Sequence, residues 1–260
     1  MATLGSGSGP TPGHDPAESP DLTHSLPAGS LWQVDVDLDA YSNSRGPGLA
    51  TQVRAGRRLK VLEAPLEPET ERVRVRLLED GYPCWLERRS LIHHGRATLA
   101  PSPRPWNRSQ IEPRLDAVLA FAEAAMAEPN VYLWGGTLGP DFDCSGLVQT
   151  AFAREGIWLP RDAYLQERFC RPVAVRVGMT ERLEPGDLIF FGTPRRCTHV
   201  GLHLGGGHYL HSSGREHGRN GIAIDNLHPR NDDPVARHYR LELRGAGRVM
   251  HSHDGSPLPP

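Results

Sequence analysis

Residues 143–155 read DCSGLVQTAFARE, a stretch that predicts a short amphipathic helix with a cysteine at its start. Its apolar side chains recur at three- and four-residue steps along one face: Leu147, Val148, Ala151 and Phe152. Asp141 or Asp143 provides an acidic cap, and Gly156 provides a stop. Cys144 then lies in the first turn, where unpaired backbone N–H groups and the helix dipole stabilise a thiolate. The pattern indicates a nucleophile, although a lone cysteine on a helix is more often a small buried apolar residue.

A predicted β-hairpin downstream carries the other groups that a cysteine nucleophile needs. Residues 198–204 and 208–211 read as strands on either side of the turn Gly205-Gly206-Gly207. His199 and His211 can therefore come nearly opposite each other across the hairpin. We expect His199 to act as the base and His211 to orient it.

A zinc site is the alternative interpretation of this region, because Cys197, His199, His203, His208 and His211 are crowded together. On one strand, however, His199 and His203 would lie about 13 Å apart at roughly 3.3 Å per residue, which is too far to share one ion. We therefore expect no metal and no cofactor.

The order of predicted elements indicates an α+β domain at residues 109–250. A capping box of Ser109 and Glu112 begins a helix that ends near residue 128. Its apolar residues recur at helical spacing: Ile111, Leu115, Val118, Leu119, Ala122 and Met126. After the helix that contains Cys144, an antiparallel sheet is predicted from strands at residues 187–191, 198–204, 208–211 and 222–224.

A smaller all-β domain, a barrel or sandwich, is predicted at residues 31–95, where short apolar alternations are separated by turn signals. Residues 1–30 are rich in Gly, Ser and Pro, which predicts a disordered tail. Residues 96–108 contain three prolines and predict a stiff linker between the domains. Residues 251–260 are expected to form a loose tail.

Composition excludes several classes of protein. The 260 residues include 29 Lys and Arg and 31 Asp and Glu, for a formal net charge of -2, which argues against nucleic-acid and membrane partners. No apolar run is long enough to span a bilayer, and residues 1–20 lack the features of a secretory signal. We expect a cytoplasmic protein, in which the four cysteines stay reduced.

Several motifs, taken in their order along the chain, resemble the NlpC/P60 family of cysteine peptidases. They are Tyr132-Leu-Trp-Gly-Gly136, Asp143-Cys-Ser-Gly146, Leu159-Pro-Arg-Asp162, Leu183-Glu-Pro-Gly-Asp-Leu188, Thr198-His-Val-Gly201 and His211-Ser-Ser-Gly214. Residues 31–95, with Asp80-Gly-Tyr-Pro-Cys-Trp85, resemble the bacterial SH3-like domain that precedes the peptidase in γ-D-glutamyl-diaminopimelate endopeptidases.

The resemblance implies a papain-like α+β peptidase domain behind a small SH3-like barrel. It implies cleavage of peptidoglycan stem peptides between γ-linked D-glutamate and meso-diaminopimelate, with Cys144, His199 and His211 as the catalytic residues. Tyr132 corresponds to the aromatic residue that helps to bind the oxyanion. For a cytoplasmic enzyme, this activity implies recycling of imported wall fragments.

Substrate-binding residues are also implied by the resemblance. Asp162 corresponds to the acidic residue that holds the free amine of an N-terminal L-alanine, and its alternative is a helix cap. Tyr82 corresponds to the tyrosine with which the SH3-like domain closes the cleft. Trp134 is either a substrate contact or ordinary core packing. Asp143 and Ser145, beside the nucleophile, are expected to contact substrate, unless Ser145 only satisfies a backbone group.

Two other functions stay open at this point. Papain-like Cys-His domains catalyse several acyl transfers, so the chain is alternatively an amidase or acyltransferase acting on another amide or ester. The second alternative is a non-catalytic protein that binds wall peptides.

Overall fold

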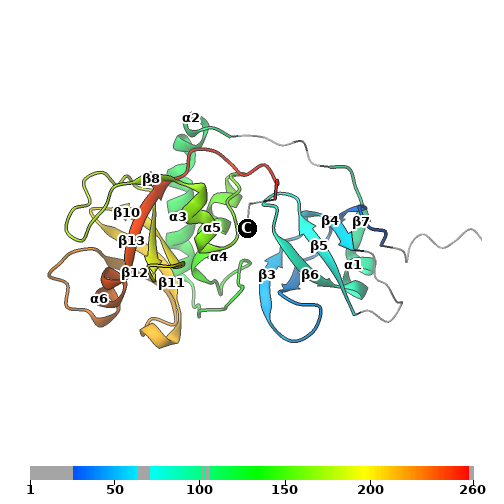
Figure 1. Cartoon of the computed structure of the whole chain (residues 1–260), viewed down its shortest axis with the longest axis horizontal. Helices are drawn as coiled ribbons and strands as arrows, with labels where there is room; N and C mark the ends of the chain where they lie inside the picture. Colours follow the sequence, from blue (N-terminus) through cyan, green and yellow to red (C-terminus); the bar gives the residue numbers. More distant parts are fainter. Residues whose placement is uncertain (1–25, 64–70, 101, 103–105, 258–260) are drawn as a thin grey trace, which may run out of the picture.

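The computed structural model describes residues 26–63, 71–100, 102 and 106–257. An all-β domain and an α+β domain lie side by side, and the last described residues run from the second domain back to the first (Figure 1). Most of the N-terminal tail predicted at residues 1–30 lies outside the described residues, as do residues 101 and 103–105 of the predicted linker and residues 258–260.

The first domain is a seven-stranded antiparallel sheet with the strand order β3-β2-β6-β5-β4-β1-β7. Alternation explains its core: in the strand Arg72–Leu77, the apolar residues Val73, Val75 and Leu77 are buried. One helix, α1 (Arg88–His94), precedes the last strand. The strands are β1 (Leu31–Val34), β2 (Leu38–Tyr41), β3 (Leu49–Val53), β4 (Arg58–Glu63), β5 (Arg72–Leu77), β6 (Pro83–Glu87) and β7 (Gly95–Ala97).

The second domain packs helices against a six-stranded antiparallel sheet with the order β12-β11-β10-β9-β13-β8. The strands are β8 (Arg171–Val173), β9 (Leu188–Gly192), β10 (Cys197–Gly205), β11 (His208–Ser213), β12 (Gly221–Asn226) and β13 (Leu243–Arg248). The helices are α2 (Arg108–Ile111), η2 (Glu112–Arg114), α3 (Leu115–Ala127), α4 (Cys144–Arg154), α5 (Ala163–Phe169), η3 (Arg215–His217) and α6 (Pro234–Leu241). The predicted α+β class and the all-β N-terminal domain are confirmed.

The predicted apolar face of helix α4 is confirmed, because Leu147, Val148, Ala151 and Phe152 all lie in the core of the second domain, but the helix is buried on its polar side as well. Its side chains from Cys144 to Phe152 are all buried. The core of the second domain covers Leu147 and Phe152. The first domain covers the polar side, where Gln149 Nε2 donates to Asp80 Oδ2 at 2.8 Å. Helix α4 is thus buried between the two domains. The spacing of apolar residues along the helix cannot indicate that a second domain covers its polar side.

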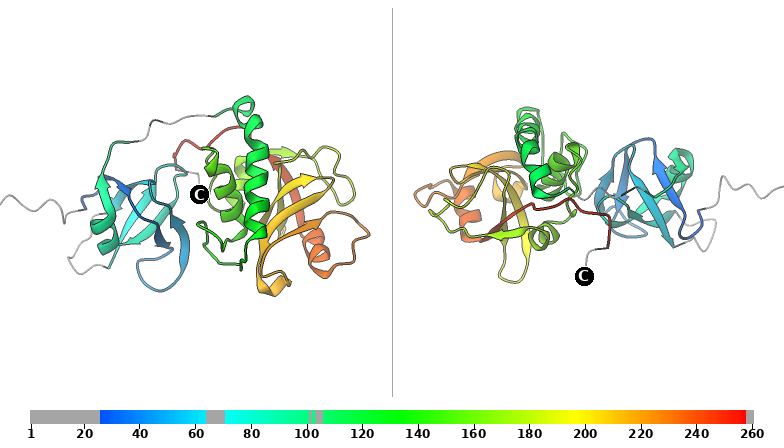
Figure 2. Two further views of the ribbon diagram at one scale, coloured as in Figure 1. Left: turned by 180° about the vertical axis from the view of Figure 1, so that it is seen from behind. Right: turned by 90° about the horizontal axis from the view of Figure 1, so that it is seen from above.

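The two domains lie side by side in both views of Figure 2. Their junction is hydrogen-bonded at several points. The Gln52 carbonyl accepts from the Thr137 hydroxyl at 3.0 Å, and its side-chain oxygen accepts from the Thr137 N–H at 3.1 Å. Arg57 pairs with Asp80 at 2.9 Å and lies over the Trp158 ring at 4.6 Å. The structure therefore holds the first domain directly against the peptide segments that flank α4.

Two local predictions are corrected. The capping box at the start of α2 is formed by Asn107 and Gln110, two residues before the predicted pair Ser109 and Glu112. The predicted loose tail is ordered at its start, because the N–H groups of Ser252 and His253 donate to the Trp106 and Trp158 carbonyls and both residues are buried. In the described part of the chain, no helix has the length and apolarity required to cross a bilayer.

Candidate active site

Cys144 is the first residue of α4 and is 6% exposed. Asp143 caps the helix by accepting the Gly146 N–H at 2.6 Å. The backbone N–H groups of Val200 and Ser145 donate to the Cys144 sulfur, which places the thiol against β10. Burial, together with the charge of Asp143, nevertheless raises the pKa of the Cys144 thiol to about 12. The N–H groups at the helix N-terminus act in the expected direction and lower this pKa, but desolvation outweighs them.

His199 on β10 and His211 on β11 are in direct contact. Nε2 of His199 lies 2.8 Å from Nδ1 of His211, with the rings nearly perpendicular. Nε2 of His211 lies 2.8 Å from Oδ2 of Asp225 on β12. All three side chains are buried, at 7%, 0% and 3% exposure. The structure thus brings together the two histidines of the predicted catalytic group and adds a carboxylate behind them.

A cavity of about 580 Å³ opens at Cys144. All of the other predicted substrate and oxyanion residues line it: Tyr82, Tyr132, Trp134, Asp143, Ser145 and Asp162. Ser42, Leu49 and Ala50 of the first domain form part of the wall. The cavity therefore lies between the two domains, and Cys144 is part of its lining.

The aromatic residues at the cavity differ in their surroundings. Burial strongly raises the pKa of the Tyr132 phenol. Cys144 lies close enough that the negative charge of its thiolate would raise this pKa further. The hydroxyl therefore stays protonated and able to donate a hydrogen bond. Trp134 is 71% exposed, so the alternative of core packing is wrong for this residue.

Asp143 and Ser145 are held by Arg161, a buried residue of the motif Leu159-Pro-Arg-Asp162 for which the sequence predicts no role of its own. Arg161 donates to both carboxylate oxygens of Asp143 and, at 3.0 Å, to the Ser145 hydroxyl. Its Nε donates to the Thr51 hydroxyl of the first domain at 3.1 Å. Asp143 also accepts the Gly135 N–H at 2.9 Å. The predicted substrate contacts of Asp143 and Ser145 stay predictions, because both side chains already have partners.

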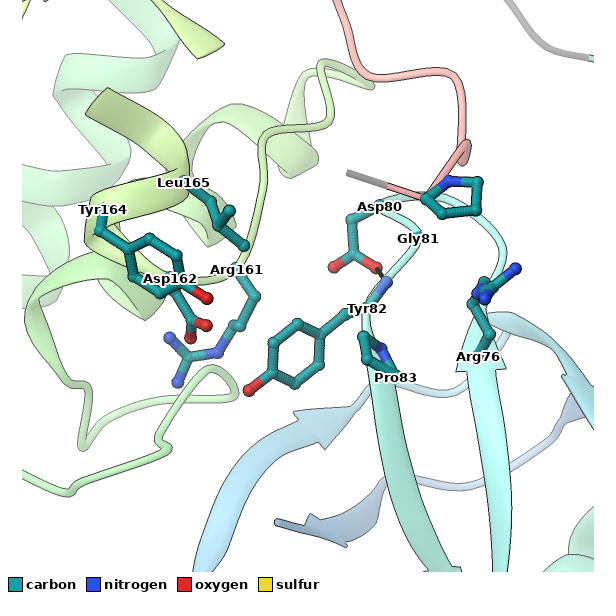
Figure 3. A pocket seen from close by; sticks show the side chains of 10 residues that line it. Arg76, Asp80, Gly81, Tyr82, Pro83, Arg161, Asp162, Tyr164 and Leu165 are labelled. Carbon is teal, nitrogen blue, oxygen red and sulfur yellow. Dashed lines mark hydrogen bonds between the residues drawn. The ribbon is translucent and has the colours of Figure 1, made fainter. Parts of the chain in front are cut away.

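Asp162 and Tyr82 face each other across the domain junction, and Figure 3 shows both side chains directed into the space between the domains. Burial raises the pKa of Asp162, against the opposing effects of Arg161 and of the nearby Tyr82 hydroxyl. Asp162 occupies the N-cap position of α5, yet its side chain makes no capping hydrogen bond. The carboxylate is therefore directed to the cavity.

The remaining histidines of the hairpin are placed differently from a zinc site. His203 Nδ1 lies 2.9 Å from the Glu184 carbonyl, and its Nε2 accepts the Gly207 N–H at 3.2 Å. His208 packs against His228 with ring centroids 5.4 Å apart. Within residues 26–63, 71–100, 102 and 106–257, no group of three or more His, Cys, Asp or Glu side chains is arranged to hold a metal ion.

Comparison with known proteins identifies both domains. Residues 129–235 match the model of the NlpC/P60 family, and residues 41–91 match that of the bacterial dipeptidyl-peptidase Sh3 domain. A gamma-D-glutamyl-L-lysine dipeptidyl-peptidase of Bacillus cereus is 32% identical over 139 residues, which are 52% of this chain and 37% of that protein. A probable endopeptidase p60 of Listeria innocua is 34% identical over 108 residues, 42% of this chain and 21% of that protein.

The chain thus matches well under half the length of these curated relatives. A crystal structure of an NlpC/P60 family protein from Bacillus cereus aligns with a TM-score of 0.42 and 26% identity, covering 85% of this chain and 64% of that chain. The two family matches confirm the resemblance of the motifs. The chain carries an NlpC/P60 domain preceded by a bacterial SH3 domain.

Proposed function

We propose that this protein is a cysteine peptidase that cleaves the bond between γ-linked D-glutamate and the following diamino acid in peptides with a free N-terminal L-alanine. The observation that carries the proposal is a single cavity that contains Cys144, Tyr82 and Asp162 and lies between the two domains. The names of relatives as gamma-D-glutamyl-L-lysine dipeptidyl-peptidases support the class of bond.

In the proposed reaction, His199 accepts the Cys144 proton while the sulfur attacks the γ-carbonyl carbon of D-glutamate. The raised pKa of the thiol makes this base necessary, since little thiolate is present at neutral pH. The Tyr132 hydroxyl donates to the oxyanion. His199 then gives its proton to the departing amine as the C–N bond breaks. Water hydrolyses the thioester, which releases the γ-carboxylate and restores the thiol.

The free-amine requirement rests on Asp162 and Tyr82. The half-buried Asp162 carboxylate, which lines the cavity, forms an ion pair with the L-alanine ammonium, and this pairing offsets the cost of partly burying both charges. Tyr82 of the first domain closes the cavity near this carboxylate. Such a cleft admits peptides already released from the glycan, so recycling of wall fragments is the proposed role.

The first test compares L-Ala-γ-D-Glu-meso-diaminopimelate with its N-acetylated twin, with the products read by mass spectrometry. We expect L-Ala-γ-D-Glu and free diaminopimelate from the free-amine peptide. Acetylation removes the ammonium and leaves Asp162 unpaired, so kcat/KM should fall by about 100-fold. A parallel peptide with L-lysine in third place tests the diamino acid.

Equal cleavage of the two peptides would keep the peptidase and reject the roles of Asp162 and Tyr82. Cleavage of neither, nor of the lysine peptide, would favour the amidase, acyltransferase or binding-protein alternatives.

Arg196 also lines the cavity, and its positive charge is complementary to the free α-carboxylate of this substrate. Arg196 lies over the Tyr164 ring at 4.1 Å, close enough to Asp162 to lower the pKa of that carboxyl against the larger effect of burial. It makes no ion pair with another residue in the described ranges. We propose that its guanidinium binds the free α-carboxylate of γ-linked D-glutamate, which lies between the alanine amine and the scissile bond.

Arg196→Gln is therefore expected to remove selectivity for D-glutamate over D-isoglutamine, whose α-carboxylate is an amide. The wild type should prefer the carboxylate substrate by about tenfold or more, as for a charge-assisted pair. Steady-state kinetics on both peptides gives the ratio, and Arg195→Gln on the same loop is the matched control. An equal preference in wild type and Arg196→Gln would exclude this role.

A further inference from the structure

The contact between His199 and His211 continues to a carboxylate that no sequence motif contains. Asp225 lies on β12, where Ala223 pairs with His211 and Asp225 pairs with Tyr209, so Asp225 and His211 are diagonal neighbours on adjacent strands. Oδ2 of Asp225 lies 2.8 Å from Nε2 of His211. The chain from His199 through His211 to Asp225 is thus formed by side chains on three consecutive strands of the sheet.

The protons along this chain have one consistent arrangement when both histidines are neutral. An ionised carboxylate only accepts, so Nε2 of His211 carries its proton. Nδ1 of His211 is then an acceptor, and Nε2 of His199 must donate to it across 2.8 Å. Nδ1 of His199 is left without a proton. We infer that Asp225 is a positioning residue, which fixes the tautomers of both histidines so that Nδ1 of His199 is the base. The inference rests on the proposed cysteine-peptidase function.

Asp225 is itself held in place by Arg219. Nε of Arg219 donates to Oδ2 of Asp225 at 3.2 Å, and a terminal nitrogen of Arg219 donates to Oδ1. Burial alone would raise the pKa of Asp225, but hydrogen bonds from His211 and Arg219 outweigh it and hold this pKa below its ordinary value. The carboxylate is therefore ionised across the pH range in which histidine titrates.

The same arginine connects Asp225 to the helix that packs on His199. Arg219 donates to Asp233 at 2.8 Å, and Asp233 caps α6 through the N–H groups of Val235 and Ala236. Tyr239 of α6 stacks on His199 with ring centroids 4.4 Å apart. Arg219 thus helps to position both the Asp225 carboxylate and, through α6, the ring of His199.

The test is the pH dependence of kcat/KM for Asp225→Asn on L-Ala-γ-D-Glu-meso-diaminopimelate. Asparagine keeps the shape of the side chain but removes the charge that stabilises the imidazolium. The pKa of the histidine pair should fall, so the acidic limb of the profile, where activity rises as histidine loses its proton, should move to lower pH. Loss of the enforced tautomer should lower kcat by about 10- to 1000-fold while KM changes little.

Other charged and titratable groups also face the pair of His199 and His211 and contribute to the position of the acidic limb. They are Tyr209 on β11, Asp225 on β12, Arg219 in the loop before β12, Tyr239 on α6 and the Cys144 thiol at the start of α4. Asp187→Asn is the matched control, because Asp187 is also a buried carboxylate bound to an arginine, and its side chain accepts from Arg248 and the Glu184 N–H rather than from a histidine. It should lower the melting temperature and leave the acidic limb in place.

Nitrogen-15 NMR of the histidine rings in the wild-type protein tests the proton arrangement without substrate. Protons on Nε2 of both His199 and His211 are expected. A proton on Nδ1 of His211, or a pH profile that is the same in Asp225→Asn and wild type, would overturn the inference. Failure of the proposed peptidase function is distinguishable, since no peptide would then be cleaved while the NMR result still reports the tautomers.

Discussion

Replacement of Cys144 by alanine is expected to abolish cleavage of L-Ala-γ-D-Glu-meso-diaminopimelate, with a loss of at least about 10⁴-fold in kcat. The reason is geometric. Cys144 is the first residue of α4 and lines the cavity, and its sulfur accepts the Val200 N–H. Removing the sulfur leaves a site that still binds peptide but cannot form the thioester. The side chain is small, so the melting temperature should change little.

Cys170→Ala is the matched control for this prediction. Cys170 is also buried, at 5% exposure, but packs in the core of the second domain near Gly247, away from the cavity residues. It should keep wild-type kcat, and its melting temperature should change about as little as that of Cys144→Ala. Single-turnover assays at high enzyme concentration, with products read by mass, measure both variants. Cleavage above trace level by Cys144→Ala would show that another group is the nucleophile.

The parts of the site that sequence could predict are those with local signals. A cap, a helical period and a glycine stop place α4 within a residue or two of its ends, and a glycine-rich turn between alternating stretches places β10 and β11. Because a hairpin has few registers, the meeting of His199 and His211 follows from those same signals.

Other features depend on contacts between distant segments, which local patterns do not report. Asp225 reaches His211 through the pairing of β11 with β12, and no motif marks that register. The raised pKa of Cys144 arises because two domains bury α4, and helix position alone predicts the opposite direction. The ordered start of the predicted tail likewise depends on partners at Trp106 and Trp158.

Arg161→Met is expected to destabilise the protein by about 3–5 kcal/mol, the usual cost of removing one partner of a buried ion pair. Arg161 is 2% exposed and donates to both oxygens of Asp143. Methionine fills much of the volume but leaves the Asp143 carboxylate buried without its cation. It also removes hydrogen bonds to Ser145 and to Thr51 of the first domain.

Urea unfolding followed by tryptophan fluorescence measures this loss, with Arg154→Met on the exposed end of α4 as the control, expected within about 0.5 kcal/mol of wild type. Adding Asp143→Asn to Arg161→Met should recover part of the stability, because asparagine caps a helix as well as aspartate and carries no charge. Recovery would show that the buried charge is the cause. If Arg161→Met were as stable as wild type, the pair would contribute nothing to the domain junction, and the Asp143 carboxylate would have to be neutral or solvated in the folded protein.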